Sequence, residues 1–267
     1  MIKFFKYFIQ AVFIYLFFLI GKILGLNLSR KIYSFIFNKI GPLIKSNSNI
    51  RENLSNFSKN ISDTEVELIK SKMWSNYGKT FIEYIFLNKF KKNNSHIKIK
   101  GEEKLNEIRQ NEKPVIFVSG HFANFELMSM EIFKKKLKLA TIYRPLNNYF
   151  LNFFMEYLRK KFICKNQIKK GRSGVKNAIE YIQNNYSIAL MIDQRVTEGE
   201  KIKFFNKVSF TTTLPAQLAL KYDLPIFPIF IERKENDSFE MEIYKPINSS
   251  EYKDKFEVSK KLNEILE

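Results

Sequence analysis

The chain has 267 residues, enough for one large domain or two small ones around a buried core. Hydrophobic residues make up 45% of the chain and aromatic residues 15%, which excludes intrinsic disorder as its overall class. With 45 Lys and Arg against 27 Asp and Glu, the net charge is +18, which predicts an anionic partner: nucleic acid, an anionic membrane or a phosphorylated substrate. The single cysteine, Cys164, excludes a disulfide framework and a cysteine-ligated metal site.

The amino-terminal segment 1–26 is predicted to be a membrane-associated helix. Residues 7–26 form an apolar run that only Gln10 and Lys22 interrupt, and twenty helical residues span about 30 Å, the thickness of the hydrocarbon core of a bilayer. Basic residues flank the run on both sides, so the positive-inside rule gives no firm orientation. A cleaved secretory signal is disfavoured, because the run is long and no small-residue cleavage site follows it. A spanning helix and a helix lying in the interface both remain open.

Residues 27–90 are predicted to form a helical connector. The polar segment 27–61, rich in Asn and Ser, is typical of a helical hairpin or a linking segment. Ser62 to Glu65 matches a capping box, and apolar residues at helical spacing then continue to about Phe86.

Residues 91–267 are predicted to form an α/β domain, because short β-branched or aromatic runs alternate there with amphipathic helical stretches. This alternation favours a mixed, mostly parallel central sheet with helices on both faces. The expected strands are 96–100, 114–119, 139–143, 187–193, 225–232 and 239–244. The expected helices are 102–111, 124–136, 148–161, 174–184, 214–222 and 254–266.

His121 is the stronger of two candidate catalytic histidines, since His96 is expected to be a solvated residue at a strand edge. His121 follows the strand 114–119, and open α/β sheets place their ligands beyond the carboxyl ends of strands. Five residues rotate about 140° on a regular helix, so His121 meets Glu126 only if it lies in the turn before the helix. Glu126 would then fix the ring tautomer and leave the other nitrogen as a general base. The alternative is a turn histidine beside a glutamate that the helix dipole favours.

The string SGHFANFELM (119–128) resembles the catalytic block of the lipid A biosynthesis late acyltransferases, the lauroyl and myristoyl transferases of the glycerolipid acyltransferase superfamily. Their pattern is G-H-F-G-N-W-E-like; here Ala123 replaces the second glycine and Phe125 the tryptophan. Further blocks match in order: RENLSNF (51–57), GKTFIEY (78–84), YRPLNN (143–148), LMIDQ (190–194), KIKFFN (201–206) and residues 211–230. Coverage runs from about residue 45 to the end.

The resemblance implies that His121 is the base and Glu126 the acidic group that orients it. It implies that Arg144 binds an anionic group or stabilises charge on the carbonyl oxygen. Asn124 is assigned to substrate binding with Asp193 and Gln194, which follow another strand end; for these last two, a hydrogen-bonded pair that fixes a loop is an equal alternative.

The basic residues are concentrated in one segment of the domain. Residues 131–176 hold thirteen basic and two acidic side chains, and Arg159 and Lys170 within it are further candidates for substrate binding. A phosphorylated glycolipid, an anionic membrane and an acidic acyl carrier protein would all be attracted to it.

The resemblance therefore predicts an O-acyltransferase without metal or cofactor, at the cytoplasmic side of a bacterial inner membrane. It would transfer an acyl chain from acyl carrier protein to a lipid A precursor in lipopolysaccharide biosynthesis. One alternative keeps the chemistry with acyl-CoA and a lysophospholipid or another glycolipid; a rival class is a membrane-tethered basic binding protein. Family members usually continue past the pattern that ends at Glu267, so the tail is dispensable or the sequence is a fragment.

Overall fold

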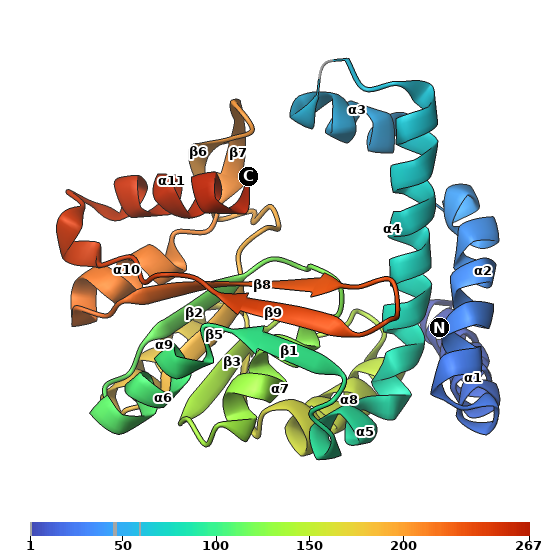
Figure 1. Cartoon of the computed structure of the whole chain (residues 1–267), viewed down its shortest axis with the longest axis horizontal. Coiled ribbons are helices and arrows are strands. Elements are labelled where there is room, and N and C mark those ends of the chain that lie inside the picture. Colours follow the sequence, from blue (N-terminus) through green and yellow to red (C-terminus); the bar gives the residue numbers. More distant parts are fainter. Residues whose placement is uncertain (1, 45–46, 59) are drawn as a thin grey trace. The chain divides into compact units, whose positions relative to one another are not determined.

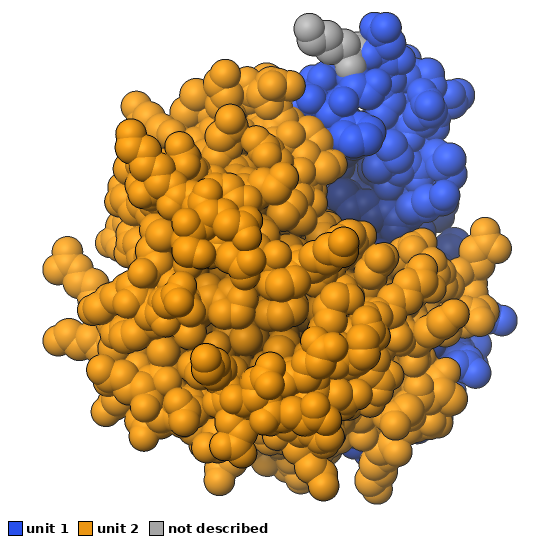
Figure 2. All heavy atoms as spheres, turned by 60° about the vertical axis from the view of Figure 1, so that its left-hand side comes forward, with its two compact units in different colours: residues 1–89, 148–151 blue, residues 90–147, 152–267 orange. Residues whose placement is uncertain are grey.

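The structure is a computed structural model that describes residues 2–44, 47–58 and 60–267. It divides into two compact units, which Figure 2 shows in different colours. Unit 1 comprises Met1–Lys89 with Asn148–Leu151, and unit 2 comprises Phe90–Asn147 with Asn152–Glu267.

Unit 1 is helical. Its helices are α1 (Ile2–Leu24), α2 (Leu26–Ile44), α3 (Asn47–Phe57) and α4 (Asp63–Glu83), and a 3-10 turn, Tyr84–Phe86, extends α4. The predicted capping box is present at the start of α4: the Ser62 hydroxyl accepts from the Glu65 N–H, and the Ser62 N–H donates to the Glu65 carboxylate. The capping box thereby gives hydrogen-bond partners to two N–H groups at this helix end, where the first N–H groups have no partner within the helix.

Helices α2 and α4 pack closely because glycine lies where their backbones meet. A Cβ on Gly78 of α4 would overlap the backbone carbonyl of Tyr33 in α2. Between the same helices, Arg30 Nε donates to Glu83 Oε1 at 2.6 Å, with both side chains almost fully buried. A buried charge is tolerated when it is paired in this way.

Helix α1 exposes most of its apolar surface. Within the part of the chain that the structure describes, it is the one helix whose length and apolar composition would allow it to cross a membrane. Only 17% of its most apolar stretch is buried. Phe13, Leu19 and Ile23, for example, are each more than half exposed. An exposed apolar surface of this extent is typical of a membrane or protein contact.

Residues 148–151 belong to unit 1 because they pack on α1. The Asn148 amide donates to the Tyr7 carbonyl at 2.8 Å, and the Tyr15 hydroxyl donates to the Phe150 carbonyl at 2.8 Å. The ring of Tyr149 lies edge-on to that of Tyr7, 5.9 Å away. Helix α1 thus contacts at least three of these four residues.

Unit 2 is built on a seven-stranded sheet with a separate two-stranded hairpin (Figure 1). The strands are β1 (Ile97–Lys100), β2 (Ile116–Ser119), β3 (Leu139–Tyr143), β4 (Asn166–Lys169), β5 (Ser187–Met191), β8 (Ile226–Arg233) and β9 (Phe239–Ile243), and the hairpin is β6 (Glu200–Phe204) with β7 (Lys207–Thr211). The helices are α6 (Glu102–Asn111), α7 (Glu126–Lys134), α9 (Arg172–Gln183), α10 (Leu214–Tyr222) and α11 (Lys255–Leu266). Two helices include residues of both units, α5 (Leu87–Lys92) and α8 (Tyr149–Leu158).

The sheet is mixed and mostly parallel, as the sequence predicted. Its strand order is β1-β9-β8-β2-β5-β3-β4, and the five strands from β8 to β4 run parallel. Strands β9 and β1 run in the opposite direction, since β9 pairs antiparallel with β8 and parallel with β1. The β2–β3 and β4–β5 connections advance in opposite directions along the sheet, so right-handed crossovers put α7 and α9 on opposite faces.

The core on the α9 face explains why these strands are apolar. Ile116 of β2 and Ile188 of β5 are fully buried there against Ala178 of α9 and Ala216 of α10. Phe117, the residue after Ile116 in β2, is also fully buried, and strand alternation directs its side chain to the other face of the sheet. Strands buried on both sides have continuous rather than alternating apolar sequences.

Three features of unit 2 were not expected from the sequence. The short polar strand β4 adds an edge to the sheet, and residues 200–211 form a hairpin. The helix expected over 148–161 ends as α8 at Leu158, and a π-helical turn, Arg159–Ile163, follows it. Such turns are rare and occur frequently at functional sites.

Candidate active site

His121 and Asp193 lie together because their strands are neighbours in register. Ser119, the last residue of β2, pairs with Met191, the last residue of β5. His121 and Asp193 each follow that pair by two residues, so both project from the same carboxyl edge of the sheet. The Ile192 N–H donates to the Ser119 carbonyl at 2.9 Å and continues the pairing up to the site.

Asp193 contacts His121 twice. Its Oδ1 lies 2.7 Å from His121 Nδ1, and its Oδ2 accepts the His121 backbone N–H at 3.0 Å. Burial alone would raise the pKa of Asp193, but the hydrogen bonds and charge of His121 outweigh that effect and lower it. The carboxyl group is therefore ionised at neutral pH.

This contact determines the tautomer of the neutral ring. An ionised carboxylate can only accept, so Nδ1 carries the proton and the lone pair is on Nε2. Nε2 lies 3.5 Å from the side-chain nitrogen of Gln194, and the His121 side chain is 32% exposed. The ring thus presents a basic nitrogen at an accessible position, as a general base requires.

The turn that carries His121 has two constrained positions. A Cβ on Gly120 would come within 2.7 Å of the Phe122 ring and 3.3 Å of Asp193 Cβ, so any side chain here would force the Phe122 ring to shift. Ala123 has a φ of 44°, in the left-handed region that favours glycine. The left-handed backbone gives a physical reason for the second glycine of the family pattern that the sequence resembles. Here Ala123 adopts this left-handed conformation although it carries a Cβ.

Aromatic rings surround the turn. The Phe125 ring lies edge-on to the His121 ring, with 4.6 Å between centroids. Phe122 stacks on Phe230 of β8 at 5.0 Å. Phe125 thus supplies an apolar contact to the imidazole, and the Phe122–Phe230 pair anchors the turn on β8.

Glu126 has a different partner from the one the sequence analysis expected. The carboxylate hydrogen-bonded to the His121 ring belongs to Asp193, whereas Glu126 Oε1 accepts from Arg159 Nε at 2.8 Å and from its Nη2 at 2.5 Å. The expectation of a direct contact between His121 and Glu126 is therefore corrected. The reason is geometric: Glu126 is the first residue of α7, and that helix directs it toward the π-helical turn.

The Glu126–Arg159 pair is buried and anchored on both sides. The two side chains are only 8% and 11% exposed, and the Arg159 guanidinium also lies over the Tyr143 ring, 5.4 Å from its centroid. The Tyr143 hydroxyl donates to Glu156 of α8 at 2.5 Å. Arg159 thus joins the start of α7 to β3 and α8, and the substrate contact expected for it from the sequence stays a prediction.

Arg144 and Lys170 lie on the outer part of the same edge. Arg144 directly follows β3 and Lys170 directly follows β4. The last residues of these paired strands, Tyr143 and Lys169, lie opposite each other, and Arg144 and Lys170 are both exposed. Burial and the charge of Arg144 lower the pKa of Lys170, against the opposing effect of Glu198. Two neighbouring cations at an accessible strand edge are suited to an anionic group.

Asn124 lies beneath the turn rather than on its surface. It is 2% exposed, and its backbone carbonyl accepts from the Leu127 N–H at 3.1 Å in the first turn of α7. The structure therefore brings His121, Asp193 and Gln194 together, leaves Arg144 and Lys170 at the outer strands, and buries Asn124. The substrate-binding roles assigned to these residues stay predictions.

Sequence reasoning missed two relationships in this site. Asp193 had been assigned to the substrate or to its loop, and Arg159 to the substrate. One signal for Asp193 was available: like His121, it follows a predicted apolar strand closely, and adjacent parallel strands bring such residues together.

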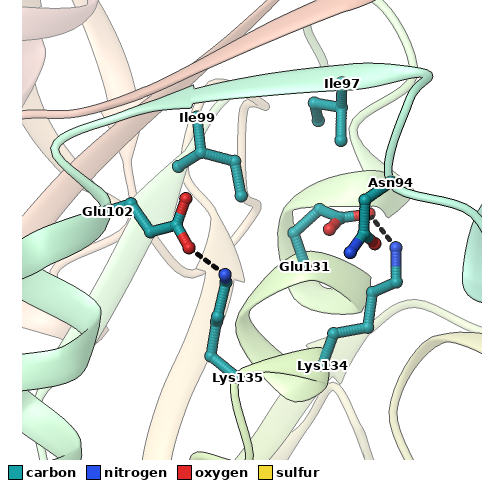
Figure 3. Close-up of a pocket in the computed structure, with 7 residues that line it drawn as sticks. All are labelled: Asn94, Ile97, Ile99, Glu102, Glu131, Lys134 and Lys135. Atoms are coloured by element: carbon teal, nitrogen blue, oxygen red, sulfur yellow. Dashed lines mark hydrogen bonds and ion pairs between the residues drawn. The ribbon is translucent and has the colours of Figure 1, made fainter.

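A hollow beside the edge strand β1 contains none of the predicted site residues. Figure 3 shows it beside β1, with a volume of about 240 Å³, lined by Asn94, Ile97, Ile99, Glu102, Glu131, Lys134 and Lys135. Its charged groups pair with one another, Lys134 with Glu131 at 2.8 Å and Lys135 with Glu102. A hollow whose charges are matched in this way offers no net charge to a ligand.

Comparison with known proteins identifies the family of the chain. A sequence model described as bacterial lipid A biosynthesis acyltransferase matches residues 2–267. The chain belongs to this acyltransferase family. It is also 24% identical over 250 residues to lipid A biosynthesis acyltransferase 2 of Shigella flexneri, across 87% of this chain and 77% of that protein. Membership of the family supports an acyltransferase role in lipid A biosynthesis, in which an acyl donor and a lipid A acceptor are required.

Proposed function

We propose that the chain transfers a fatty acyl group from an acyl thioester to a hydroxyl group of a lipid A precursor. The observation that carries the proposal is the His121–Asp193 contact at the carboxyl edge of the sheet. It supports a ring held in one tautomer with an accessible basic nitrogen, in a chain whose family transfers acyl groups.

In the proposed reaction, His121 Nε2 removes the proton from the acceptor hydroxyl while its oxygen attacks the thioester carbonyl carbon. The tetrahedral oxyanion collapses and the C–S bond breaks. The departing thiolate takes the proton from the imidazolium, which restores the neutral ring. General-base help of this kind contributes roughly 10²–10⁴ in rate.

Asp193 and Glu126 support this step differently. Asp193 holds the ring and stabilises the imidazolium that forms during attack, as a carboxylate does beside a catalytic histidine. Glu126 acts through Arg159, whose buried pair fixes the first turn of α7 and the turn that carries His121. Glu126 thus keeps a role in catalysis, by positioning rather than by contact with the ring.

Arg144 and Lys170 are proposed to bind an anionic part of a substrate, such as the phosphate of the glycolipid. Both lie at the strand edge that carries His121, and their mutual repulsion would be relieved by an anion. Asn124 is proposed to support the turn from below, and Gln194 to keep the acceptor hydroxyl near Nε2.

We further propose that α1 attaches the protein to the bacterial inner membrane, with unit 2 on the cytoplasmic side. The exposed apolar surface of α1 supports attachment, and a lipid acceptor requires it. Replacement of Leu16 and Ile20 by arginine should shift the protein from the membrane to the soluble fraction, whereas Leu220→Arg on α10 should not.

The test of the reaction is incorporation of a labelled acyl chain into a lipid A precursor by the wild type and by His121→Ala. We expect at least a 100-fold loss in the variant, with an unchanged melting temperature. Equal incorporation by both proteins would overturn the mechanism. Parallel assays with acyl carrier protein thioester and acyl-CoA as donors, and with a lysophospholipid as acceptor, identify the substrates.

A further inference from the structure

The hairpin β6–β7 presents one face that carries exposed cations. Residues directly opposite each other in an antiparallel pair share a face, and the pairs Lys201–Phe210 and Lys203–Val208 define one. Lys201 and Lys203 are exposed, and Val208 is 66% exposed. We name these four residues, together with Arg195, the cationic hairpin face.

The opposite face of the hairpin is fixed to α11. Ile202 is buried there, the Asn263 amide donates to the Lys203 carbonyl at 2.9 Å, and Lys255 pairs with Glu200 at 2.8 Å. Figure 1 shows the hairpin beside the end of α11. These contacts hold the hairpin on α11, and the cationic hairpin face lies on the other side of the hairpin.

This face starts next to the active site. Gln194, which lies 3.5 Å from His121 Nε2, is followed directly by Arg195. The Arg195 guanidinium lies over the Phe210 ring, 5.0 Å from its centroid, so Arg195 contacts the face through Phe210. A partner bound on this face could thus contact Arg195, whose neighbour in the sequence, Gln194, lies beside the His121 ring.

The charges of the face are unmatched. Among the residues that the structure describes, no carboxylate pairs with Arg195, Lys201 or Lys203, and none belongs to the face. Val208 and Phe210 add apolar area between the cations, as in a protein interface.

We propose that the cationic hairpin face docks an acidic surface of the acyl carrier protein that delivers the thioester. The proposal rests on the proposed function, since it names the carrier of that donor. A lipid headgroup surface would also be attracted to cations, but the apolar side chains between them and the position beside Gln194 favour a protein that must bring its thioester to His121.

The test measures binding of fluorescently labelled acyl carrier protein, loaded with a fatty thioester, to full-length protein carrying His121→Ala, so that the thioester is not consumed. In this background, Lys203→Glu should weaken binding at least 5-fold and Lys201→Glu/Lys203→Glu at least 20-fold. Lys207→Glu is the matched control, because it makes the same charge change on the other face of the hairpin. It should change binding less than 2-fold, and added salt should reduce the difference between the variants.

Equal weakening by Lys203→Glu and Lys207→Glu, or no weakening by either, would overturn the docking surface. Unchanged carrier affinity with weaker binding to anionic vesicles would also overturn it, in favour of a lipid contact. Acyl transfer by variants with an otherwise wild-type sequence separates the two proposals. If wild-type protein transfers acyl chains and the Lys201→Glu/Lys203→Glu variant has an unchanged KM for the carrier, the docking surface alone fails; no transfer by the wild type from any thioester means that the proposed function fails.

Discussion

The Asp193 carboxylate holds His121 by two atoms at once, the ring Nδ1 and the backbone N–H. The two residues are 72 positions apart and meet because each follows the same paired strand ends by two residues. A carboxylate that binds both the ring and the backbone fixes the rotation of the imidazole as well as its tautomer. The orientation of the His121 ring thus depends on a residue that follows a different strand.

Asp193→Asn is the variant that tests this dependence. An amide of the same shape can donate to Nδ1 and so favour the wrong tautomer, which takes the lone pair away from Nε2. We expect kcat for acyl transfer to fall by roughly 10²–10⁴ with the melting temperature within a few degrees of the wild type. A variant that keeps more than a tenth of the wild-type kcat would contradict the assignment.

The same contact predicts an acid dependence of stability. The folded-state pKa of Asp193 is lowered, so its stabilising contribution is complete above the unfolded-state value of about 3.9. That contribution is lost as the pH falls from there through the folded pKa. The difference in unfolding free energy between the wild type and Asp193→Asn should therefore shrink as the pH falls below about 4. Denaturant titrations at several pH values in this range measure it, and a difference that grows as the pH falls through this range would contradict the contact.

The buried Glu126–Arg159 pair predicts strong coupling. Removal of one partner leaves a buried charge and typically costs about 3–5 kcal/mol, so Glu126→Gln and Arg159→Met should each lower the unfolding free energy markedly. The double variant should be more stable than the sum of the two losses implies. If Glu126 acts by positioning, the double variant should also recover part of the lost kcat. Additive losses in a double-mutant cycle would show that the two side chains do not act as a pair.

Ala123 predicts a stabilising glycine. A left-handed conformation costs an alanine roughly 1–2 kcal/mol, and the extra freedom that glycine gains in the unfolded chain offsets about 0.5–1 kcal/mol of this. Ala123→Gly should therefore raise the unfolding free energy by up to about 1 kcal/mol. Ala140→Gly, in the buried strand β3, is the control and should lower it. A loss of stability in Ala123→Gly as large as in the control would show that the left-handed conformation carries no strain.

The sequence by itself determined the class of fold and the position of His121. Continuous apolar runs such as 114–119 predicted buried parallel strands, and β3 and α10 occupy the expected ranges, because strands buried on both faces and amphipathic helices have distinct periods. The capping box at Ser62 depends on residues three positions apart and was visible for the same reason. The placement of His121 just beyond a strand end also followed from local pattern.

Only the tertiary structure decided which carboxylate meets the ring. Glu126 is near His121 in sequence, but α7 turns it toward Arg159, while the pairing of β2 with β5 brings Asp193 from 72 residues away. Strand β4 and the hairpin were missed because their short sequences are largely polar and are stabilised by partners rather than by an apolar pattern. Contacts between strands depend on register and strand order, and these are fixed by packing of the whole sheet.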